Sequence, residues 1–256
     1  MCTLAVAFST DRRFPLVVAA NRDEHLVRPA EGWALRENPH GNLSPLRRPE
    51  GAGRVAAPLD LSGGGTWIGV SPAGVFAALT NFHPPEGGWP DRRRRSRGEL
   101  VLRALAAPDA PTAAEALSAL DAGRYNPFHL VVADAARAFL WRYDGRRASL
   151  DPLAPGLHVV TERSGDGSDP RALRVRARWP LDPSVPALAA LLALPEAPGE
   201  PAVCVHDSDT YGTRSAAILR LAGRLSESEL FVADGPPCAA PFEDRGRLLS
   251  ALARSA

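Results

Sequence analysis

The chain has 256 residues, of which 45% are hydrophobic, and its formal net charge is +1. This composition predicts a folded protein with a substantial core, and it argues against intrinsic disorder and against electrostatic binding of nucleic acid. The length suits one domain, 1–256, because no stretch reads as a long linker. All 30 basic residues are Arg, so a Schiff-base lysine, a pyridoxal anchor and a phosphate-loop lysine are excluded.

The sequence contains no apolar run of roughly 18 or more residues, and no basic segment followed by an apolar one near its start. We therefore expect a cytoplasmic protein without a membrane span. The cysteines Cys2, Cys204 and Cys238 show no CxxC spacing, and their odd number argues against a disulfide framework or structural zinc. We expect no metal and no cofactor, and the sequence does not specify the oligomeric state.

The first stretch, from Cys2 to Phe8, is apolar and short enough for a core strand. Loss of Met1 would leave Cys2 with both a thiol and a free α-amino group. The amine has an ordinary pKa of about 7.7–8.0 and the thiol one of about 8.5, so the amine can accept the thiol proton near neutral pH. The pattern therefore indicates a self-contained nucleophile, and a small buried residue at a strand start is the alternative.

A second apolar run at 15–20 follows a polar turn, which predicts an antiparallel hairpin with the first strand. This run ends in four polar residues, Asn21-Arg22-Asp23-Glu24. In such a hairpin they lie at the open end, where Cys2 begins the first strand. An ordinary charged turn is the alternative interpretation, because strand ends are commonly polar.

The sequence resembles the NRDE family, also called the transport-and-Golgi-organisation family, which is named for the tetrapeptide at 21–24. The resemblance implies an α+β, N-terminal-nucleophile architecture: a four-layer αββα sandwich with two antiparallel sheets packed face to face between helical layers. It covers nearly the whole chain. Beside the tetrapeptide, the matching motifs are Met1-Cys2, Arg28-Pro29, 64–70, 77–81, 96–100, 125–130, 155–159 and 211–215.

The remaining segments give a coarse order of elements. Residues 30–62 read as long surface loops with one short strand, and 66–70 and 75–81 as a hairpin around the turn 71–74. Capping-box spacing from Thr112 to Glu115 predicts the start of a helix. Further strands are expected at 128–133, 138–143, 157–161 and 230–233, and further helices at 98–105, 169–178, 184–194 and from 243.

Three other patterns each allow an ordinary structural interpretation and a functional one. The run Arg92 to Arg97 is either a solvated loop or an anion site, and Arg97 is the candidate for the anion site because the resemblance includes it. His129 and His158 lie inside apolar runs, which is typical of strand histidines rather than ligands. Cys204 and Cys238 read as structural or incidental, since no base or metal-ligand spacing accompanies them.

The chain is similar in its active-site pattern to N-terminal-nucleophile amidases of the choloylglycine hydrolase and penicillin acylase type. That similarity implies Cys2 as nucleophile, Arg22 lowering the thiol pKa, and Asp23 accepting from the α-ammonium group. It further implies Asn81 as an oxyanion donor and Arg214 as a partner of Asp23 or of a substrate carboxylate. The candidate substrate-binding residues are Trp67, Arg97 and Tyr211.

One departure from the family pattern bears on catalysis. After 155–159 relatives usually carry Ser-Asn, whereas this chain reads Thr161-Glu162, and a carboxylate there would repel a forming oxyanion.

Three interpretations of the function stay open. The first is an amidohydrolase that cleaves a C–N bond of a small anionic or amphipathic substrate through an acyl-enzyme. The second is a non-catalytic handler of a small molecule such as haem or an acyl-CoA-like lipid, and the third is a purely structural role.

Overall fold

The computed structural model describes residues 2–38, 53–84 and 90–254. Two antiparallel sheets form its centre, and each has seven strands within the described residues. The first sheet has the order β10-β1-β2-β12-β13-β14, with β11 added beside β12. Its strands are β1 Cys2–Phe8, β2 Leu16–His25, β10 Gly156–Thr161, β11 His206–Ser208, β12 Tyr211–Leu221, β13 Glu229–Ala233 and β14 Glu243–Asp244.

The second sheet runs in simple chain order from β3 to β9. This order means that each strand pairs with the next one along the chain, and the segment between β6 and β7 contains α1 and α2. The turn between β5 and β6 places Gly74 at a φ of 78°, a value that glycine adopts without steric cost. The strands are β3 Ala30–Glu37, β4 Arg54–Asp60, β5 Ile68–Val70, β6 Phe76–Asn81, β7 Phe128–Ala133, β8 Ala138–Tyr143 and β9 Ala148–Pro152.

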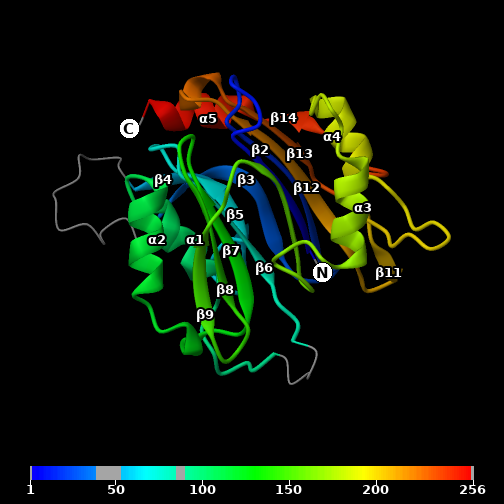
Figure 1. Ribbon diagram of the computed structural model, residues 1–256, viewed down its shortest axis with the longest axis horizontal. Helices are drawn as coiled ribbons and strands as arrows, with labels where there is room; N and C mark the ends of the chain where they lie inside the picture. The colour runs from blue at the N-terminus through cyan, green and yellow to red at the C-terminus, as the bar shows by residue number, and fades with distance from the viewer. Residues whose placement is uncertain (1, 39–52, 85–89, 255–256) are drawn as a thin grey trace.

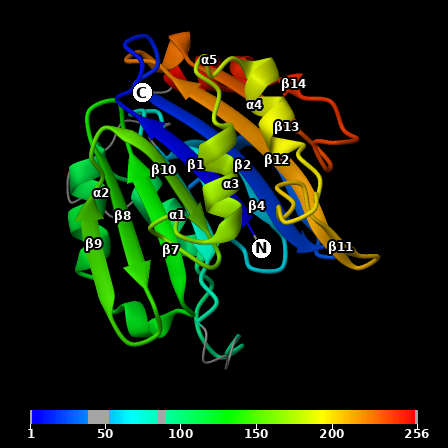
Figure 2. The same ribbon diagram turned by 45° about the vertical axis from the view of Figure 1, so that its right-hand side comes forward.

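Helices cover the outer faces of both sheets (Figures 1 and 2). Helices α1 (Gly98–Leu105) and α2 (Ala110–Ser118) pack on the second sheet, and α3 (Pro170–Arg178) and α4 (Val185–Leu192) pack on the first. Helix α5 (Gly246–Ala253) contributes Leu249 and Leu252 to the core between the sheets. Short 3-10 turns lie at Ala122–Arg124 and Leu225–Glu227. The α+β, four-layer αββα architecture expected from the sequence is confirmed.

Strand alternation explains how one chain fills three core layers. Along β1, Leu4 and Val6 pack between the two sheets, whereas Ala5 and Ala7 pack against α3 and α4. Successive strand side chains point to opposite faces, so a strand covered on both sides must be apolar throughout. We call the side of the first sheet that faces the second sheet its inner face, and the side beneath α3 and α4 its outer face.

Two expectations for local structure are wrong. Residues 30–62 contain two paired strands rather than one short strand in loops, although 39–52 lie outside the described residues. Trp33 and Leu35 alternate toward the core, which is the strand signal that the surrounding Pro and Gly residues obscure. Helix α2 begins at Ala110, because the Asp109 side chain caps it by accepting from the backbone N–H of Thr112 at 2.7 Å.

The tetrapeptide at 21–24 is part of β2 and not a turn after it. Arg22 pairs with Cys2 of β1, and β12 continues alongside β2 as far as His25. Both neighbours supply backbone hydrogen bonds through the polar residues, so the strand extends to the edge of the sheet. No helix in the described parts of the chain is long and apolar enough to cross a membrane.

Candidate active site

Cys2 opens β1 at one end of the first sheet. The antiparallel register places it directly opposite Arg22. Because Leu4 and Val6 pack between the sheets, alternation puts the Cys2 side chain on the same inner face. Its Sγ lies 3.9 Å from the backbone carbonyl of Asp23, which accepts from the thiol. The hairpin thus brings the candidate nucleophile and the tetrapeptide together, as predicted.

Alternation along β2 divides the tetrapeptide between two environments. Val17 and Ala19 pack against the outer helices, so Asn21 and Asp23 also lie on the outer face. Asn21 donates through Nδ2 to the carbonyls of Leu192 and Val203, at 2.9 Å each. Arg22 lies between these residues and points the other way, to the inner face. Arg22 and Asp23, two of the three charged residues of the motif, therefore lie in different layers.

A narrow pocket opens beside Cys2 between the two sheets. Cys2 and Arg22 line it from the first sheet, and Trp33 and Trp67 line it from the second. Its hollow part measures about 30 Å³, which is room for one or two water molecules. The site is therefore a slot bounded by a thiol, an arginine and two indole rings.

The Arg22 guanidinium lies over the Trp67 ring, with Cζ 4.2 Å from the ring centroid. A second contact joins Arg22 Nη2 to Glu24 Oε2 at 3.9 Å. Burial of the guanidinium, of which 7% is exposed, lowers the pKa of Arg22 from its ordinary value, and the nearby Cys2 and Glu24 charges oppose that shift. This arrangement holds a positive charge against an aromatic wall, where it can meet an anionic group.

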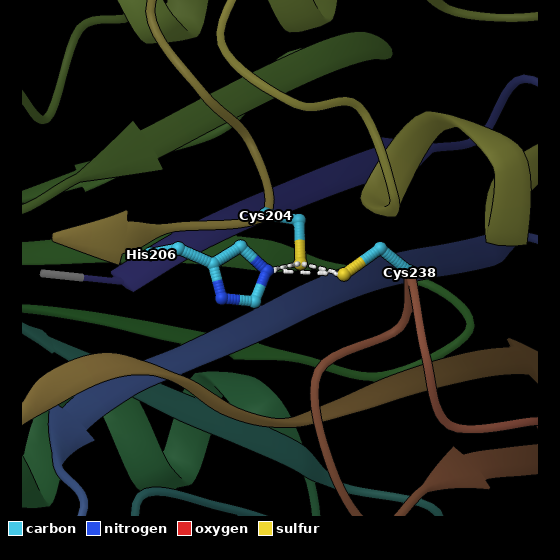
Figure 3. A group of neighbouring side chains, drawn as sticks. All are labelled: Cys204, His206 and Cys238. Atoms are coloured by element: carbon cyan, nitrogen blue, oxygen red, sulfur yellow. Dashed lines mark hydrogen bonds between the residues drawn. The ribbon is translucent and has the colours of Figure 1, made fainter. Parts of the chain in front are cut away.

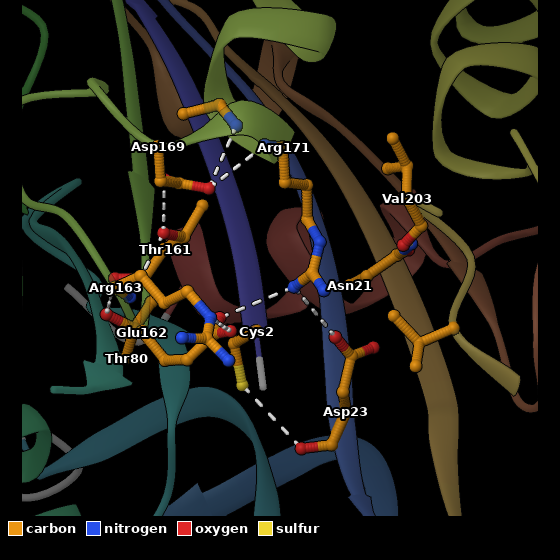
Figure 4. A network of polar contacts seen from close by, with 12 residues as sticks. Cys2, Asn21, Asp23, Thr80, Thr161, Glu162, Arg163, Asp169, Arg171 and Val203 are labelled. Carbon is orange, nitrogen blue, oxygen red and sulfur yellow. Dashed lines mark hydrogen bonds and ion pairs between the residues drawn. The ribbon is translucent and has the colours of Figure 1, made fainter. Parts of the chain in front are cut away.

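Charged and polar groups surround Asp23 on the outer face (Figure 4). Thr213 of β12 donates through Oγ1 to Asp23 Oδ1 at 2.6 Å. Arg171 of α3 places Nη1 3.8 Å from Asp23 Oδ2 and 3.4 Å from Glu162 Oε2. Asp23 and Glu162 are 3% and 1% exposed. One guanidinium thus lies between two buried carboxylates, as expected where buried charges must be paired.

The departure at Thr161-Glu162 has a structural explanation. Thr161 donates through Oγ1 to Asp169 Oδ2 at 2.6 Å, and Asp169 caps α3. Glu162 pairs with Arg171 in the first turn of the same helix. Both residues therefore bind the start of α3 to the end of β10. The Glu162 charge is compensated by Arg171 and not left bare toward the thiol.

The pKa values in the site follow from burial. Burial raises the pKa of the Cys2 thiol, and the Asp23 and Glu162 carboxylates act in the same direction. Burial also raises the pKa of Asp23 to about 6, although the Thr213 hydrogen bond and Arg171 oppose the shift. The net pKa of the thiol is therefore raised, because the loss of solvation outweighs the positive charge of the chain terminus, and the predicted effect of Arg22 on the thiol stays a prediction.

Neither Asn81 nor Arg214 lines the pocket beside Cys2. Asn81 ends β6 opposite Phe128, and it does not line the pocket, whereas its neighbour Thr80 does. Arg214 lies in a bulge of β12 between residues paired to Asp23 and Arg22. Its Nη1 donates to the backbone carbonyls of the β2–β3 turn, those of His25, Leu26 and Arg28. Its predicted pairing with Asp23 is replaced by these contacts, and the catalytic roles of both residues stay predictions.

The other predicted binding residues also have contacts within the protein. Tyr211 donates its hydroxyl to the Asp23 carbonyl at 3.1 Å, the same oxygen that accepts from the Cys2 thiol. Arg97 donates through Nη1 to the Pro127 carbonyl at 3.1 Å. Burial lowers the pKa of Arg97 to about 9, and a Cys2 thiolate would oppose that shift. Both residues lie near Cys2, and their substrate-binding roles stay predictions.

Sequence reasoning missed Arg171 and the pairing that it makes. Helix α3 carries four arginines, and only its docking on the sheet decides which of them are buried. Thr213 lies inside a motif that the family resemblance includes, so that motif was the available signal for it. No comparable signal marks Arg171, because the pattern of the helix does not distinguish it from its neighbours.

Comparison with known proteins agrees with the family resemblance. The sequence model of the family described as Transport and Golgi organisation 2 matches residues 1–180. The human Transport and Golgi organization protein 2 homolog is 33% identical over 174 residues, which is 63% of this chain and 56% of the human protein. The bovine homolog is 34% identical over 170 residues, with the same shares. The chain thus spans about half the length of these curated relatives.

Solved structures with a similar fold include an amidase, an acylase and a hydrolase. The Caenorhabditis elegans N-acylethanolamine-hydrolyzing acid amidase ortholog superposes with a TM-score of 0.60 at 14% identity, over 86% of this chain and 92% of that one. Penicillin V acylase from Agrobacterium tumefaciens superposes with a TM-score of 0.57 at 14% identity, over 97% of this chain and 88% of that one. The C2A mutant of conjugated bile acid hydrolase from Clostridium perfringens superposes with a TM-score of 0.56 at 11% identity, over 95% of this chain and 96% of that one.

Proposed function

Since the chain belongs to the Transport and Golgi organisation 2 family, and its fold is that of the N-terminal-nucleophile amidases, we propose that it is an N-terminal-cysteine amidohydrolase. Its substrate is a small anionic or amphipathic amide. One observation carries the proposal: the Cys2 thiol lies in the wall of a pocket, where Cys2 pairs with Arg22 of the next strand and the thiol contacts the backbone carbonyl of Asp23. The bile acid hydrolase was solved as a C2A mutant, so that protein also has a cysteine at its second position.

The reaction begins after removal of Met1, which frees the α-amino group of Cys2. Because burial raises the thiol pKa, the resting thiol is neutral and needs a base. The α-amine takes the proton as the sulfur attacks the amide carbon, and it then donates to the leaving nitrogen as the C–N bond breaks. Water hydrolyses the thioester, which releases the acid and restores the thiol. Asp23 holds the ammonium form of the amine near the sulfur.

The wall of the pocket supports the choice of substrate. Arg22 offers a fixed positive charge, and Trp33 and Trp67 offer apolar surface beside it. An anionic group next to an apolar body fits this combination. The hollow part of the slot is small, so the reacting end of the substrate enters it while the remainder lies outside.

A non-catalytic handler of a small amphiphile, such as haem or an acyl-CoA-like lipid, is the second candidate. The raised pKa of the Cys2 thiol favours it, because a buried neutral thiol is a poor nucleophile without a base. For either candidate we propose a cytoplasmic location, because Cys2, Cys204 and Cys238 are free thiols and a reducing compartment keeps them so. The two candidates differ in whether the Cys2 thiol forms a covalent bond with the ligand.

Turnover of a panel of amides and thioesters separates the candidates. We expect intact mass to show a chain that begins at Cys2, and Cys2→Ala to lower kcat by roughly 10⁴-fold or more while ligand affinity is retained. As a matched control, one alanine inserted before Cys2 keeps the thiol but removes its free amine. That variant should lose turnover as well. A mature chain that retains Met1, or equal turnover in all three proteins, contradicts the hydrolase and leaves the handler.

A further inference from the structure

Three potential metal ligands converge near β11, remote in sequence from the tetrapeptide (Figure 3). Cys204 precedes β11, His206 is its first residue, and Cys238 belongs to the segment between β13 and β14. Cys204 Sγ lies 3.3 Å from Cys238 Sγ, and His206 Nε2 lies 3.1 Å from Cys238 Sγ and 3.7 Å from Cys204 Sγ. The three ligand atoms therefore form a compact triangle from two segments that are more than 30 residues apart.

We propose that Cys204, His206 and Cys238 bind one Zn²⁺ ion per chain. Tetrahedral zinc with Zn–S bonds of about 2.3 Å and a Zn–N bond of about 2.0–2.1 Å has S···S edges of about 3.8 Å and S···N edges of about 3.5 Å. The observed edges of 3.3, 3.1 and 3.7 Å differ from these by a few tenths of an ångström. Small side-chain rotations therefore suffice to seat the ion.

The chemistry of the donor set points to the same ion. Two thiolates and one imidazole are soft and borderline ligands, which suit zinc and disfavour calcium or magnesium. Binding converts two thiols to thiolates and releases their two protons to solvent. Cys204 is buried, whereas His206 and Cys238 are exposed, so an ion can enter from solvent and a water molecule can fill the fourth position.

The position of the site suggests what the ion does. Val205, next to Cys204, donates its backbone N–H to Thr213 Oγ1 at 2.8 Å, and the same hydroxyl donates to Asp23 Oδ1. Bound zinc would fix the loop after β13 to the chain segment that supports Asp23. All three ligands lie beyond the residues 1–180 that match the family, so the site belongs to the C-terminal part of this chain. The inference is independent of the proposed hydrolase activity.

Zinc titration of the metal-free, reduced protein against a chromophoric chelator tests the proposal. We expect one ion per chain and at least a tenfold loss of affinity in His206→Ala and in Cys238→Ser. These two residues are exposed, so both variants should fold even where Cys204→Ser does not. Cys2→Ser and His158→Ala are the matched thiol and imidazole controls, and they should bind zinc like the unmodified chain.

Two further measurements examine the ligands directly. Bound zinc should protect Cys204 and Cys238 from alkylation but leave labelling of Cys2 unchanged, and Co²⁺ should give a thiolate charge-transfer band and tetrahedral d–d bands. Zinc binding that survives in both His206→Ala and Cys238→Ser would overturn the assignment. So would a Cys204–Cys238 disulfide that persists under reductant and excludes the ion, or a site that takes Cu⁺ but no Zn²⁺.

Discussion

On the inner face of β2, Arg22 lies over the Trp67 ring and borders the pocket, whereas on the outer face Asp23 lies beneath α3 among charged partners. The two residues are neighbours in the chain, yet their charges are stabilised in different ways. The Trp67 ring stabilises the Arg22 guanidinium through a cation–π contact. The Arg171 guanidinium and the Thr213 hydroxyl stabilise the Asp23 carboxylate.

The difference shows how a short polar motif can serve two layers at once. The strand period of two directs one charge toward the pocket and the other toward α3. The inner face borders the pocket between the two sheets, while the outer face is covered by α3. Substitutions on the two faces should therefore change different properties: stability on the outer face, and pocket chemistry with a smaller stability effect on the inner face.

Arg171 gives the largest expected effect on the outer face. Arg171→Met leaves Asp23 and Glu162 as buried carboxylates without this guanidinium, so we expect a loss of about 3–5 kcal/mol in the free energy of unfolding. Urea denaturation at pH 7 measures it. Arg163→Met is the matched control, because Arg163 also approaches Glu162, at 3.7 Å, but its side chain is 67% exposed. That control should change stability by less than about 1 kcal/mol.

Adding Glu162→Gln to Arg171→Met sharpens this prediction. Removal of one of the two buried carboxylate charges should recover part of the loss, because the burial penalty of a neutral amide is smaller. Equal stability of Arg171→Met and Arg163→Met would show that the outer-face network is not an ion-pair network at all. In that case the contrast between the two faces of β2 fails.

The position of Arg171 also shows where sequence reasoning stopped. Apolar runs were sufficient to predict the hairpin of β1 and β2, because strand burial is encoded locally in Leu4, Val6 and Val18. The extension of β2 through the tetrapeptide was missed. A charged residue is normally excluded from a buried strand, and the groups that compensate it come from elements far along the chain.

The site shows the same division. Cys2, Arg22 and Asp23 could be brought together from sequence, because one hairpin register determines their proximity. Asn81 and Arg214 come from separate strands, and side-chain direction at a strand end or a bulge depends on local geometry that no pattern specifies. The family resemblance supplied their roles, and the structure supplies their contacts.

Asp23 gives the second-largest effect, which appears as a dependence of stability on pH. Its pKa is raised from 3.8 to about 6 by burial, with Arg171 and Thr213 opposing the shift and Glu162 adding to it. A raised carboxyl pKa means that the folded state binds the proton more tightly than the unfolded state. Protonated Asp23 therefore adds roughly 3 kcal/mol to the free energy of unfolding relative to its ionised form. This contribution is complete below about pH 4 and is lost as the pH rises through about 6.

Urea unfolding from pH 4 to pH 7 measures this contribution, with Asp23→Asn as the reference. The asparagine does not titrate, so the stability of the unmodified chain relative to Asp23→Asn should fall across that window. Other titrating groups affect both proteins and cancel in the difference. Parallel profiles for the two proteins would show that the Asp23 pKa is not raised, and would remove the electrostatic difference between the faces.

The smallest effect is expected on the inner face, in the pair of Arg22 and Trp67. A cation over an indole ring is worth about 0.5–1 kcal/mol when exposed and about 2 when desolvated, and this guanidinium is buried. A double-mutant cycle with Arg22→Met and Trp67→Leu isolates the pair. Arg13, an exposed cation whose Cζ lies 4.9 Å from the centroid of the buried Phe14 ring, provides a matched cycle with Arg13→Met and Phe14→Leu, in which the contact of Arg220 with the same ring cancels. We expect a coupling of about 1–2 kcal/mol for the inner-face pair and less than about 1 for the exposed one. Equal couplings would mean that the pocket wall gives this charge no more than solvent does, and a ligand anion would then gain little from binding there.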